Sequence, residues 1–144
     1  MTRINSAIPV RCLTDEHLLA EHREIKRLPY CLNKWNRKRR VPEKFTLGRG
    51  HVIFFFDKMK FIYESYLEVR DECIRRGFDV EDYSRNWSEF IISEYWNDYE
   101  PGCEEKVLLT ERITQKISES PKKVWHLSGR PINKDEAIKL LQNL

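Results

Sequence analysis

The sequence has no long hydrophobic run. Its longest apolar stretch, Val52 to Phe56, covers five residues, whereas a membrane-spanning helix needs about 20. The first residues, Met1 to Asn5, contain no apolar signal core. These absences argue against membrane insertion and against secretion, and we expect a cytoplasmic protein.

Glycine and cysteine are scarce, with five and four residues respectively. The sequence contains no GxGxxG, GxxxxGK[ST] or GxSxG motif, so the common phosphate-binding loops and the serine nucleophile elbow are not expected. Neither the cysteines at 12, 31, 73 and 103 nor the histidines at 17, 22, 51 and 126 have metal-ligand spacing. We therefore expect reduced thiols, mostly in the core, and no structural zinc.

Charge is distributed unevenly along the chain. The first fifty residues contain twelve Lys and Arg against five Asp and Glu, a net charge of +7. Residues 51–100 contain six against twelve, a net charge of −6, and residues 101–144 contain eight against six, a net charge of +2. The basic first third indicates either a face that binds a polyanion or an ordinary solvated surface, and charge alone does not separate the two.

Helical periodicity is the main pattern in the sequence. Apolar residues recur at intervals of three and four in three segments, residues 15–28, 51–76 and 103–120. Thr14 is a suitable N-cap for the first segment, and Pro29 is expected to end it. These segments predict the three principal helices of the protein.

The rest of the chain has either a short periodic pattern or no regular pattern. Residues 30–44 carry a dense basic cluster and are expected to form a loop or a short helix. The aromatic segment 78–102 is expected to be an ordered loop packed on the body, and a capping box at Asn133 opens a short C-terminal helix. The sequence therefore predicts a compact, all-α fold with a single domain, residues 1–144.

One face of the first predicted helix is polar. His17, Glu21, Glu24 and Arg27 are spaced by four, three and three residues, so their side chains share a stripe. A solvated helix face and part of a binding site are both consistent with this spacing.

Thr2 introduces a possible nucleophile. A small second residue permits removal of the initiator Met, which would expose the α-amino group of Thr2. The reference pKa of an α-amine is about 7.7–8.0, against about 10.4 for a Lys side chain. A useful fraction of such an amine is neutral near pH 7, and it can attack a sugar carbon to form a Schiff base. Many proteins begin Met-Thr without any catalytic role, and that reading is the alternative.

Several short motifs occur together. The N-terminal ones are Met1-Thr2-Arg3-Ile4-Asn5, Asp15-Glu16-His17-Leu18 and Ala20-Glu21-His22-Arg23-Glu24. The later ones are Gly50-His51-Val52, Phe54-Phe55 and Arg76-Gly77-Phe78. In these motifs and in their order, the sequence resembles the pyrimidine-dimer DNA glycosylase/AP lyase family of T-even phages.

The resemblance implies an all-helical domain whose N-terminal segment packs between helices. It also implies a two-step reaction, in which the Thr2 α-amine attacks C1′ of the damaged nucleotide and displaces the base. The resulting Schiff base then undergoes β-elimination, which cuts the strand. The implied partner is double-stranded DNA with a damaged base, most simply a cyclobutane pyrimidine dimer, or with an abasic site. The implied protein is a monomer that needs no metal or organic cofactor and acts on DNA in a prokaryotic or phage-infected cell.

The resemblance also assigns residues. Thr2 and Glu24 take the catalytic positions, since a carboxylate can stabilise oxocarbenium-like charge and accept the C2′ proton. The DNA-binding positions are Arg3, His17, Arg23, Arg27, Arg112 and Lys116, and guanidinium groups suit phosphate oxygens.

The sequence departs from the family at some of these places. Glu16 stands where the family has Gln, which adds negative charge near the expected DNA, and His22 stands where it has Tyr. The loop 84–100 and the C-terminal helix have no clear counterpart. The alternatives are therefore an AP lyase or glycosylase for another lesion, a DNA-binding module without catalysis, and a helical protein-interaction domain.

Overall fold

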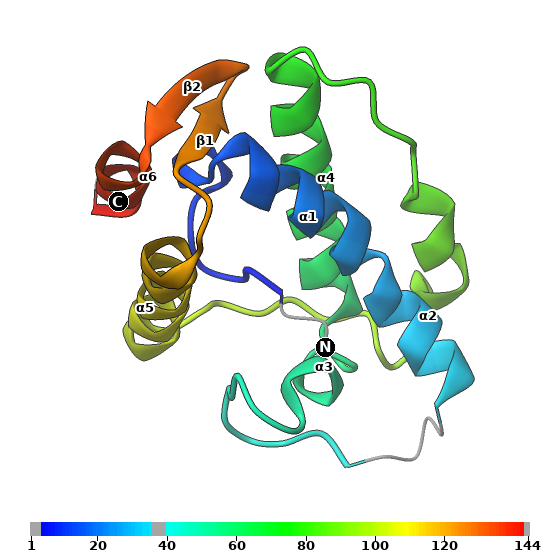
Figure 1. Ribbon diagram of the computed structural model, residues 1–144. Coiled ribbons are helices and arrows are strands. Elements are labelled where there is room, and N and C mark those ends of the chain that lie inside the picture. Colours follow the sequence, from blue (N-terminus) through cyan, green and yellow to red (C-terminus); the bar gives the residue numbers. More distant parts are fainter. Residues whose placement is uncertain (1–3, 36–39, 143–144) are drawn as a thin grey trace.

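The computed structural model describes residues 4–35 and 40–142. Within these ranges the chain forms six α-helices, two 3₁₀ helices and one two-stranded sheet (Figure 1). In chain order the elements are η1 (Val10–Cys12), α1 (Asp15–Ile25), α2 (Arg27–Lys34), α3 (His51–Phe54), α4 (Met59–Arg75), η2 (Ser84–Phe90), α5 (Cys103–Glu119), β1 (Val124–Leu127), β2 (Arg130–Asn133) and α6 (Lys134–Gln142).

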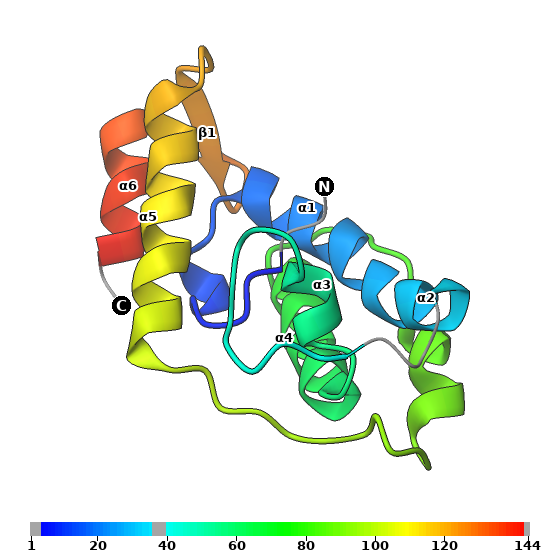
Figure 2. The ribbon, with the colours of Figure 1, turned by 90° about the horizontal axis from the view of Figure 1, so that it is seen from below.

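The arrangement places the N-terminal segment inside the fold. Helices α1 and α2 follow one another across α4, while α5 and α6 lie side by side at the opposite end of the molecule (Figures 1 and 2). Residues 4–13 run between α5 and the α1–α4 pair. This is the position that the family resemblance implied for the N-terminal segment.

Helix α1 begins as the sequence predicted but ends earlier. The Thr14 side chain accepts a hydrogen bond from the His17 amide at 3.3 Å, so Thr14 is the N-cap. The prediction that Pro29 ends the helix is wrong, because the break comes at Lys26 and Pro29 lies in the first turn of α2. Proline is tolerated there, since the first amides of a helix have no intrahelical acceptor.

The predicted single helix over 51–76 is two helices. The chain turns between α3 and α4, and the amides of Met59 and Phe61 donate to the carbonyls of Tyr95 and Asn97 at 2.9 and 3.2 Å. The aromatic loop therefore supplies hydrogen-bond acceptors for the first amides of α4, which an upstream helical turn would otherwise supply. The predicted end of this helix is confirmed, since Gly77 follows it with a φ of 89°, a left-handed conformation that favours glycine.

The C-terminal part contains a hairpin that the sequence analysis did not predict. Strands β1 and β2 pair antiparallel with Trp125 opposite Ile132. The all-α prediction is therefore correct for the principal elements and wrong for residues 124–133. The capping box of α6 is confirmed, since the Glu136 amide donates to the Asn133 side chain at 2.9 Å.

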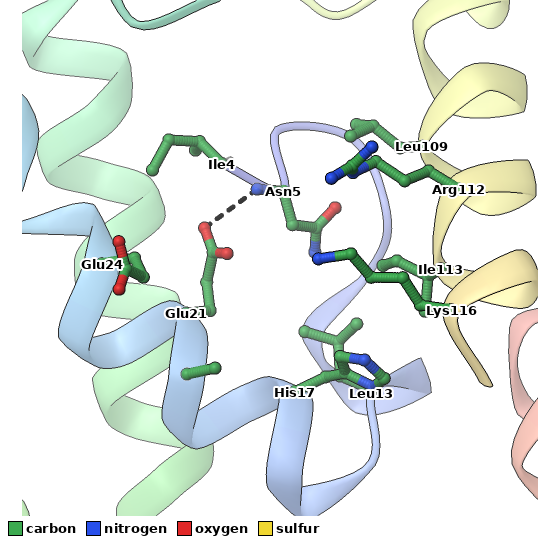
Figure 3. A pocket seen from close by; sticks show the side chains of 11 residues that line it. Ile4, Asn5, Leu13, His17, Glu21, Glu24, Leu109, Arg112, Ile113 and Lys116 are labelled. Carbon is green, nitrogen blue, oxygen red and sulfur yellow. Dashed lines mark hydrogen bonds between the residues drawn. The ribbon is translucent and has the colours of Figure 1, made fainter. Parts of the chain in front are cut away.

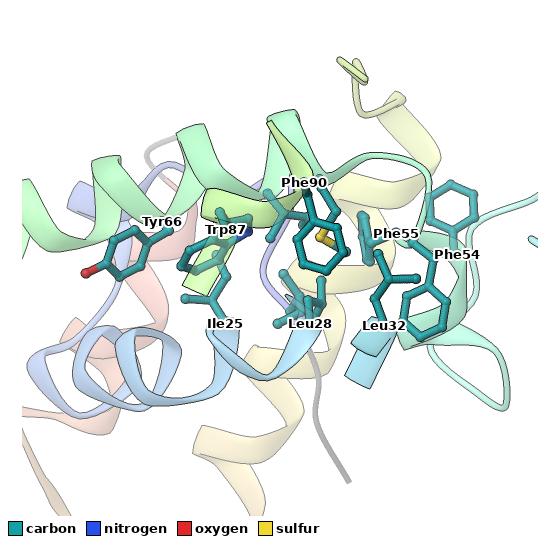
Figure 4. Packing of buried hydrophobic residues seen from close by; sticks show 12 residues of the cluster. Ile25, Leu28, Leu32, Phe54, Phe55, Tyr66, Trp87 and Phe90 are labelled. Atoms are coloured by element: carbon teal, nitrogen blue, oxygen red, sulfur yellow. The ribbon is translucent and has the colours of Figure 1, made fainter. Parts of the chain in front are cut away.

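Two clusters of buried side chains hold these elements together. In the first, Leu28 and Leu32 of α2 pack with Phe55, Trp87 and Phe90, all fully buried (Figure 4). The second lies under α5, the hairpin and α6. Trp87 and Phe90 belong to η2, so the aromatic segment is ordered on the body, as predicted. No helix among the described residues is long and apolar enough to cross a membrane.

All four cysteines are free thiols. Cys12 and Cys73 are buried, Cys31 is half-buried and Cys103 is exposed at the start of α5. The expectation of core thiols therefore holds for two of them and is wrong for Cys103. Burial raises the pKa of Cys73 to about 11, so this thiol stays protonated and unreactive near neutral pH.

Candidate active site

A pocket of about 260 Å³ lies between α1, α5 and the N-terminal segment (Figure 3). Ile4 and Asn5 form its edge on the N-terminal side, and Leu13, Leu109 and Ile113 supply apolar surface. An apolar floor of this kind excludes water from one side of a ligand and leaves polar groups on the walls to orient it.

The α1 wall carries three of the four side chains of the predicted polar stripe. His17, Glu21 and Glu24 all line the pocket, because intervals of four and three residues bring them to one face of the helix. The fourth, Arg27, lies at the start of α2 and forms an ion pair with Glu24 at 3.3 Å.

The facing wall is cationic. Arg112 and Lys116 lie one turn apart on α5, and both side chains extend toward the space between α5 and α1 (Figure 3). Leu109 and Ile113 occupy the adjacent positions of the same helix face and anchor it to the second core cluster. Two fixed cations opposite two carboxyl groups form a site that can bind a phosphate on one side and perform acid–base chemistry on the other.

The two carboxyl groups have different surroundings. Glu21 is 6% exposed, and its Oε1 accepts a hydrogen bond from the Asn5 amide at 3.0 Å. Burial raises the pKa of Glu21 to about 8 against the opposing effect of this hydrogen bond, and the nearby Glu24 carboxylate adds to the rise. Glu21 is therefore mainly protonated at pH 7, whereas Glu24, with its side chain 38% exposed, lies beside Arg27.

His17 is held in a fixed orientation on the same wall. Its ring stacks on Trp125 of the hairpin with centroids 5.2 Å apart, and Nδ1 lies 3.0 Å from the Thr14 hydroxyl. Burial lowers the pKa of His17, and the positive charge of Lys116 lowers it further. A neutral ring at this position can form a hydrogen bond with a ligand without adding positive charge to the pocket.

The predicted site residues fall into three groups. His17, Glu24, Arg112 and Lys116 are brought together at the pocket. Arg23 and Arg27 are exposed, Arg27 beside Glu24 and Arg23 outside the pocket lining. Thr2 and Arg3 lie outside the described residues, so their predicted roles stay predictions.

The two departures from the family pattern do not line the pocket. Glu16 binds the hairpin instead, since it accepts hydrogen bonds from the His126 amide at 2.9 Å and from Lys122 at 2.8 Å. Its charge is therefore paired with the hairpin, and its expected place near the DNA stays a prediction. The His22 ring lies 3.0 Å from the Glu81 carbonyl oxygen and packs beside Tyr83, away from the pocket.

Glu21 is the pocket residue whose role sequence reasoning missed. Its position in the polar stripe was visible, but its burial depends on Asn5 and on the N-terminal segment that covers it. No local pattern distinguishes a buried helix glutamate from a solvated one. Among the described residues, no group of three or more His, Cys, Asp or Glu is arranged to hold a metal ion.

A pocket with carboxyl groups on one wall and the cations Arg112 and Lys116 on the other has the chemistry to hold a phosphate-bearing ligand. Comparison with known families is more specific. Residues 1–86 match the sequence model of the pyrimidine dimer DNA glycosylase family, which is more than half of the 144 residues. The chain belongs to this family, and the family resemblance found in the sequence is confirmed. The match ends within η2, so α5 and its two cations lie beyond it.

Proposed function

We propose that the protein is a bifunctional DNA glycosylase/AP lyase that excises the damaged base of a cyclobutane pyrimidine dimer and then cuts the strand. The observation that carries the proposal is the single pocket that joins Ile4, near the chain start, to Glu24 on one wall and Arg112 and Lys116 on the other. Thr2 precedes Ile4 by two residues, and two residues of extended chain span at most about 7 Å. An α-amine on Thr2 is therefore within reach of this pocket.

In the first step, the neutral α-amine of Thr2 attacks C1′ and the C1′–N glycosidic bond breaks. The base leaves with the bonding electron pair and takes up a proton, while loss of amine protons and opening of the sugar ring give the Schiff base. Positive charge develops on the sugar as the bond breaks, and the Glu24 carboxylate stabilises it.

In the second step, a base removes a proton from C2′ and the C3′–O bond breaks. The electron pair and the negative charge leave with the phosphate of the 3′ fragment, and water later hydrolyses the Schiff base to regenerate the amine. Glu24 is the proposed base. Arg112 and Lys116 bind the flanking phosphates, together with Arg3, Arg23 and Arg27, while His17 contacts the nucleotide.

Lys26 is the alternative nucleophile. Its Nζ lies 4.0 Å from the centroid of the Tyr83 ring and outside the pocket lining. The position of Lys26 therefore favours Thr2.

Borohydride trapping tests the nucleophile. The full protein is incubated with abasic-site DNA and borohydride, and the covalent adduct is mapped by mass spectrometry. We expect the adduct on the N-terminal residue after Met1 has been removed. An adduct on Lys26 would reassign the nucleophile, and the absence of any adduct would leave a DNA-binding module without catalysis.

A defined lesion tests the substrate. Duplexes that contain one cyclobutane pyrimidine dimer, one abasic site or no lesion are compared under single-turnover conditions. We expect cleavage of one glycosidic bond of the dimer, whose base stays attached to its neighbour through the cyclobutane ring, followed by strand cleavage. We also expect cleavage of the abasic site. Cleavage of the abasic site without cleavage of the dimer duplex would favour the second reading, a lyase or a glycosylase for another lesion.

A further inference from the structure

Three consecutive residues near the start of the described chain are each bonded to a different helix. The Ile4 amide donates to His51 of α3 at 2.8 Å, and the Asn5 amide donates to Glu21 of α1 at 3.0 Å. The Ser6 hydroxyl donates to the buried carboxylate of Glu105 on α5. Chain ends are ordinarily poorly ordered unless they are tied down, and this end is tied down residue by residue.

The bond from Ile4 fixes the protonation state of His51. A backbone amide can only donate, so Nε2 is the acceptor, and the Thr46 carbonyl oxygen, 2.8 Å from Nδ1, can only accept. The ring is therefore neutral, with its proton on Nδ1. It is 1% exposed and packed against the edges of Phe45 and Phe55, so its orientation is set by packing as well as by hydrogen bonds.

Local backbone geometry places His51 at this point. Gly50, the residue before α3, has a φ of 93°, which L side chains rarely adopt. A Cβ on Gly50 would also come within 3.3 Å of Pro42. The glycine turns the chain so that the first residue of α3 reaches back to the N-terminal segment.

The Glu21 bond is equally specific. The carboxyl group is buried, and its Oε1 points directly at the Asn5 amide (Figure 3). The charged or titratable side chains that share the pocket with it are Glu24 and His17 on α1 and Arg112 and Lys116 on α5. A neutral Glu21 accepts the bond from Asn5 without adding a second negative charge beside Glu24.

We infer that His51 and Glu21 are positioning residues that clamp the Ile4 and Asn5 amides and thereby fix the N-terminal amine relative to the pocket. This inference rests on the proposed function, because it assigns the clamp to the nucleophile of that reaction. A displacement of about 1 Å at a reacting atom can cost about a hundredfold in rate. The clamp acts on the amine through the backbone, so it affects the chemical step more than DNA binding.

Paired substitutions in the full-length protein test the clamp. Glu21→Gln keeps an acceptor for the Asn5 amide and Glu21→Leu removes it, while His51→Gln keeps an acceptor for the Ile4 amide and His51→Phe removes it. We expect the two variants without an acceptor to form the borohydride-trapped adduct about tenfold or more slowly than their Gln counterparts. Their affinity for a duplex with a tetrahydrofuran abasic analogue, which cannot form a Schiff base, is expected to change less than about threefold.

Hydrogen exchange of the Ile4 and Asn5 amides tests the clamp independently of the reaction with DNA. In the wild-type protein the Ile4 and Asn5 amides are expected to exchange slowly, and Glu21→Leu is expected to release the Asn5 amide. Glu64→Leu, which removes an exposed carboxylate on α4, is the matched control and is expected to alter neither exchange nor trapping. Thermal melts identify any variant that fails to fold. If a Leu or Phe variant does so, the Gln variant at the same position is compared with the wild-type protein instead.

The outcomes separate the two proposals. If the wild-type adduct maps to an internal lysine, the proposed nucleophile is wrong, whatever the exchange data give. If the adduct maps to the N-terminal residue but the Leu and Phe variants trap as fast as the Gln variants, the clamp is wrong. Rapid exchange of both amides in the wild-type protein would also overturn it.

Discussion

Glu21 and Glu24 lie one helical turn apart on α1, yet they differ in environment. Glu21 is buried against the N-terminal segment, whereas Glu24 is partly solvated and paired with Arg27. Two carboxyl groups in different environments can have different chemical roles, one as a neutral acid and one as a carboxylate. Here Glu21 holds the Asn5 amide, and in the proposed reaction Glu24 faces the substrate.

Substitution of Glu24 tests its assigned role. Glu24→Gln keeps the shape of the side chain but removes the negative charge and the basic oxygen. We expect turnover on abasic-site DNA to fall about a hundredfold or more, while a weak borohydride adduct still forms because the amine is untouched. Glu64→Gln on α4 serves as the control, and near-normal cleavage by Glu24→Gln would refute the role.

The raised pKa of Glu21 makes a prediction about stability. Because the folded protein holds this proton up to about pH 8 and an unfolded glutamate releases it near its ordinary value of 4.5, the folded state binds more protons between those values. The contribution is therefore fully present below about pH 4.5 and is lost as pH rises toward 8.

Urea unfolding of the wild-type protein and Glu21→Gln at pH 5 and pH 8.5 measures this effect. Glutamine cannot ionise, so the difference between the two proteins isolates Glu21 from other titrating groups. We expect the wild-type protein to lose on the order of 3 kcal/mol relative to the variant as pH rises. A difference that does not change with pH would mean that Glu21 ionises normally in the folded protein.

Among the structural elements, one arginine joins three segments. Arg76, at the end of α4, donates to Glu72 at 2.7 Å and to Asp15 of α1 at 2.9 Å. It also donates to the carbonyl of Val10, and Asp15 in turn accepts from the amides of the hairpin turn at Ser128 and Gly129. Arg76 therefore couples α4, α1 and η1, and through Asp15 the hairpin.

Arg76→Leu is expected to destabilise the protein by about 3–5 kcal/mol, because it leaves the buried Asp15 carboxylate without its cation and removes the buried one of the two arginines that pair with Glu72. Arg75→Leu is the matched control. The Arg75 side chain is 63% exposed and also pairs with Glu72, but water can replace it, so little change is expected. Urea denaturation compares the two, and equal stability of both variants would contradict the coupling.

The elements that could be predicted from the sequence are those with local signals. Periodic apolar positions and caps identified α1, α5 and α6 within a few residues, together with the end of α4. The break before α4 could not be predicted, because the run Phe54 to Phe56 is apolar without period and the acceptors for α4 come from Tyr95 and Asn97. The hairpin was missed for a similar reason, since its anchors on Asp15 and Glu16 lie more than a hundred residues away.

The site was predictable to a comparable extent. Spacing placed His17 and Glu24 on one face, and the family resemblance added Arg112 and Lys116, all of which line the pocket. The burial of Glu21 and the bond between His51 and Ile4 result from tertiary packing, and no local spacing encodes them.

At the scale of the whole molecule, the basic first third of the sequence supplies only part of the proposed DNA-binding surface. The basic first third supplies Arg23 and Arg27, but the cations that line the pocket come from α5. The match to the family ends before α5 begins. The proposed function therefore places DNA contacts on both regions.

Salt dependence of DNA binding measures these contacts. The logarithm of the affinity is expected to fall linearly with the logarithm of salt concentration. Arg112→Gln and Lys116→Gln are each expected to remove one phosphate contact and thereby to reduce the magnitude of that slope by about one. Lys139→Gln on the exposed face of α6 is the control and is expected to leave the slope unchanged. A slope that none of the three alters would remove α5 from the DNA interface.

The three anchors of the N-terminal segment also set an order of events during synthesis. Residues 4, 5 and 6 leave the ribosome early, but their partners are His51, Glu21 and Glu105, respectively. Because the last of these lies about a hundred positions downstream, the segment cannot be fully docked until most of the chain has been made. The start of the chain is therefore exposed to the enzymes that trim a nascent chain before α5 completes the pocket.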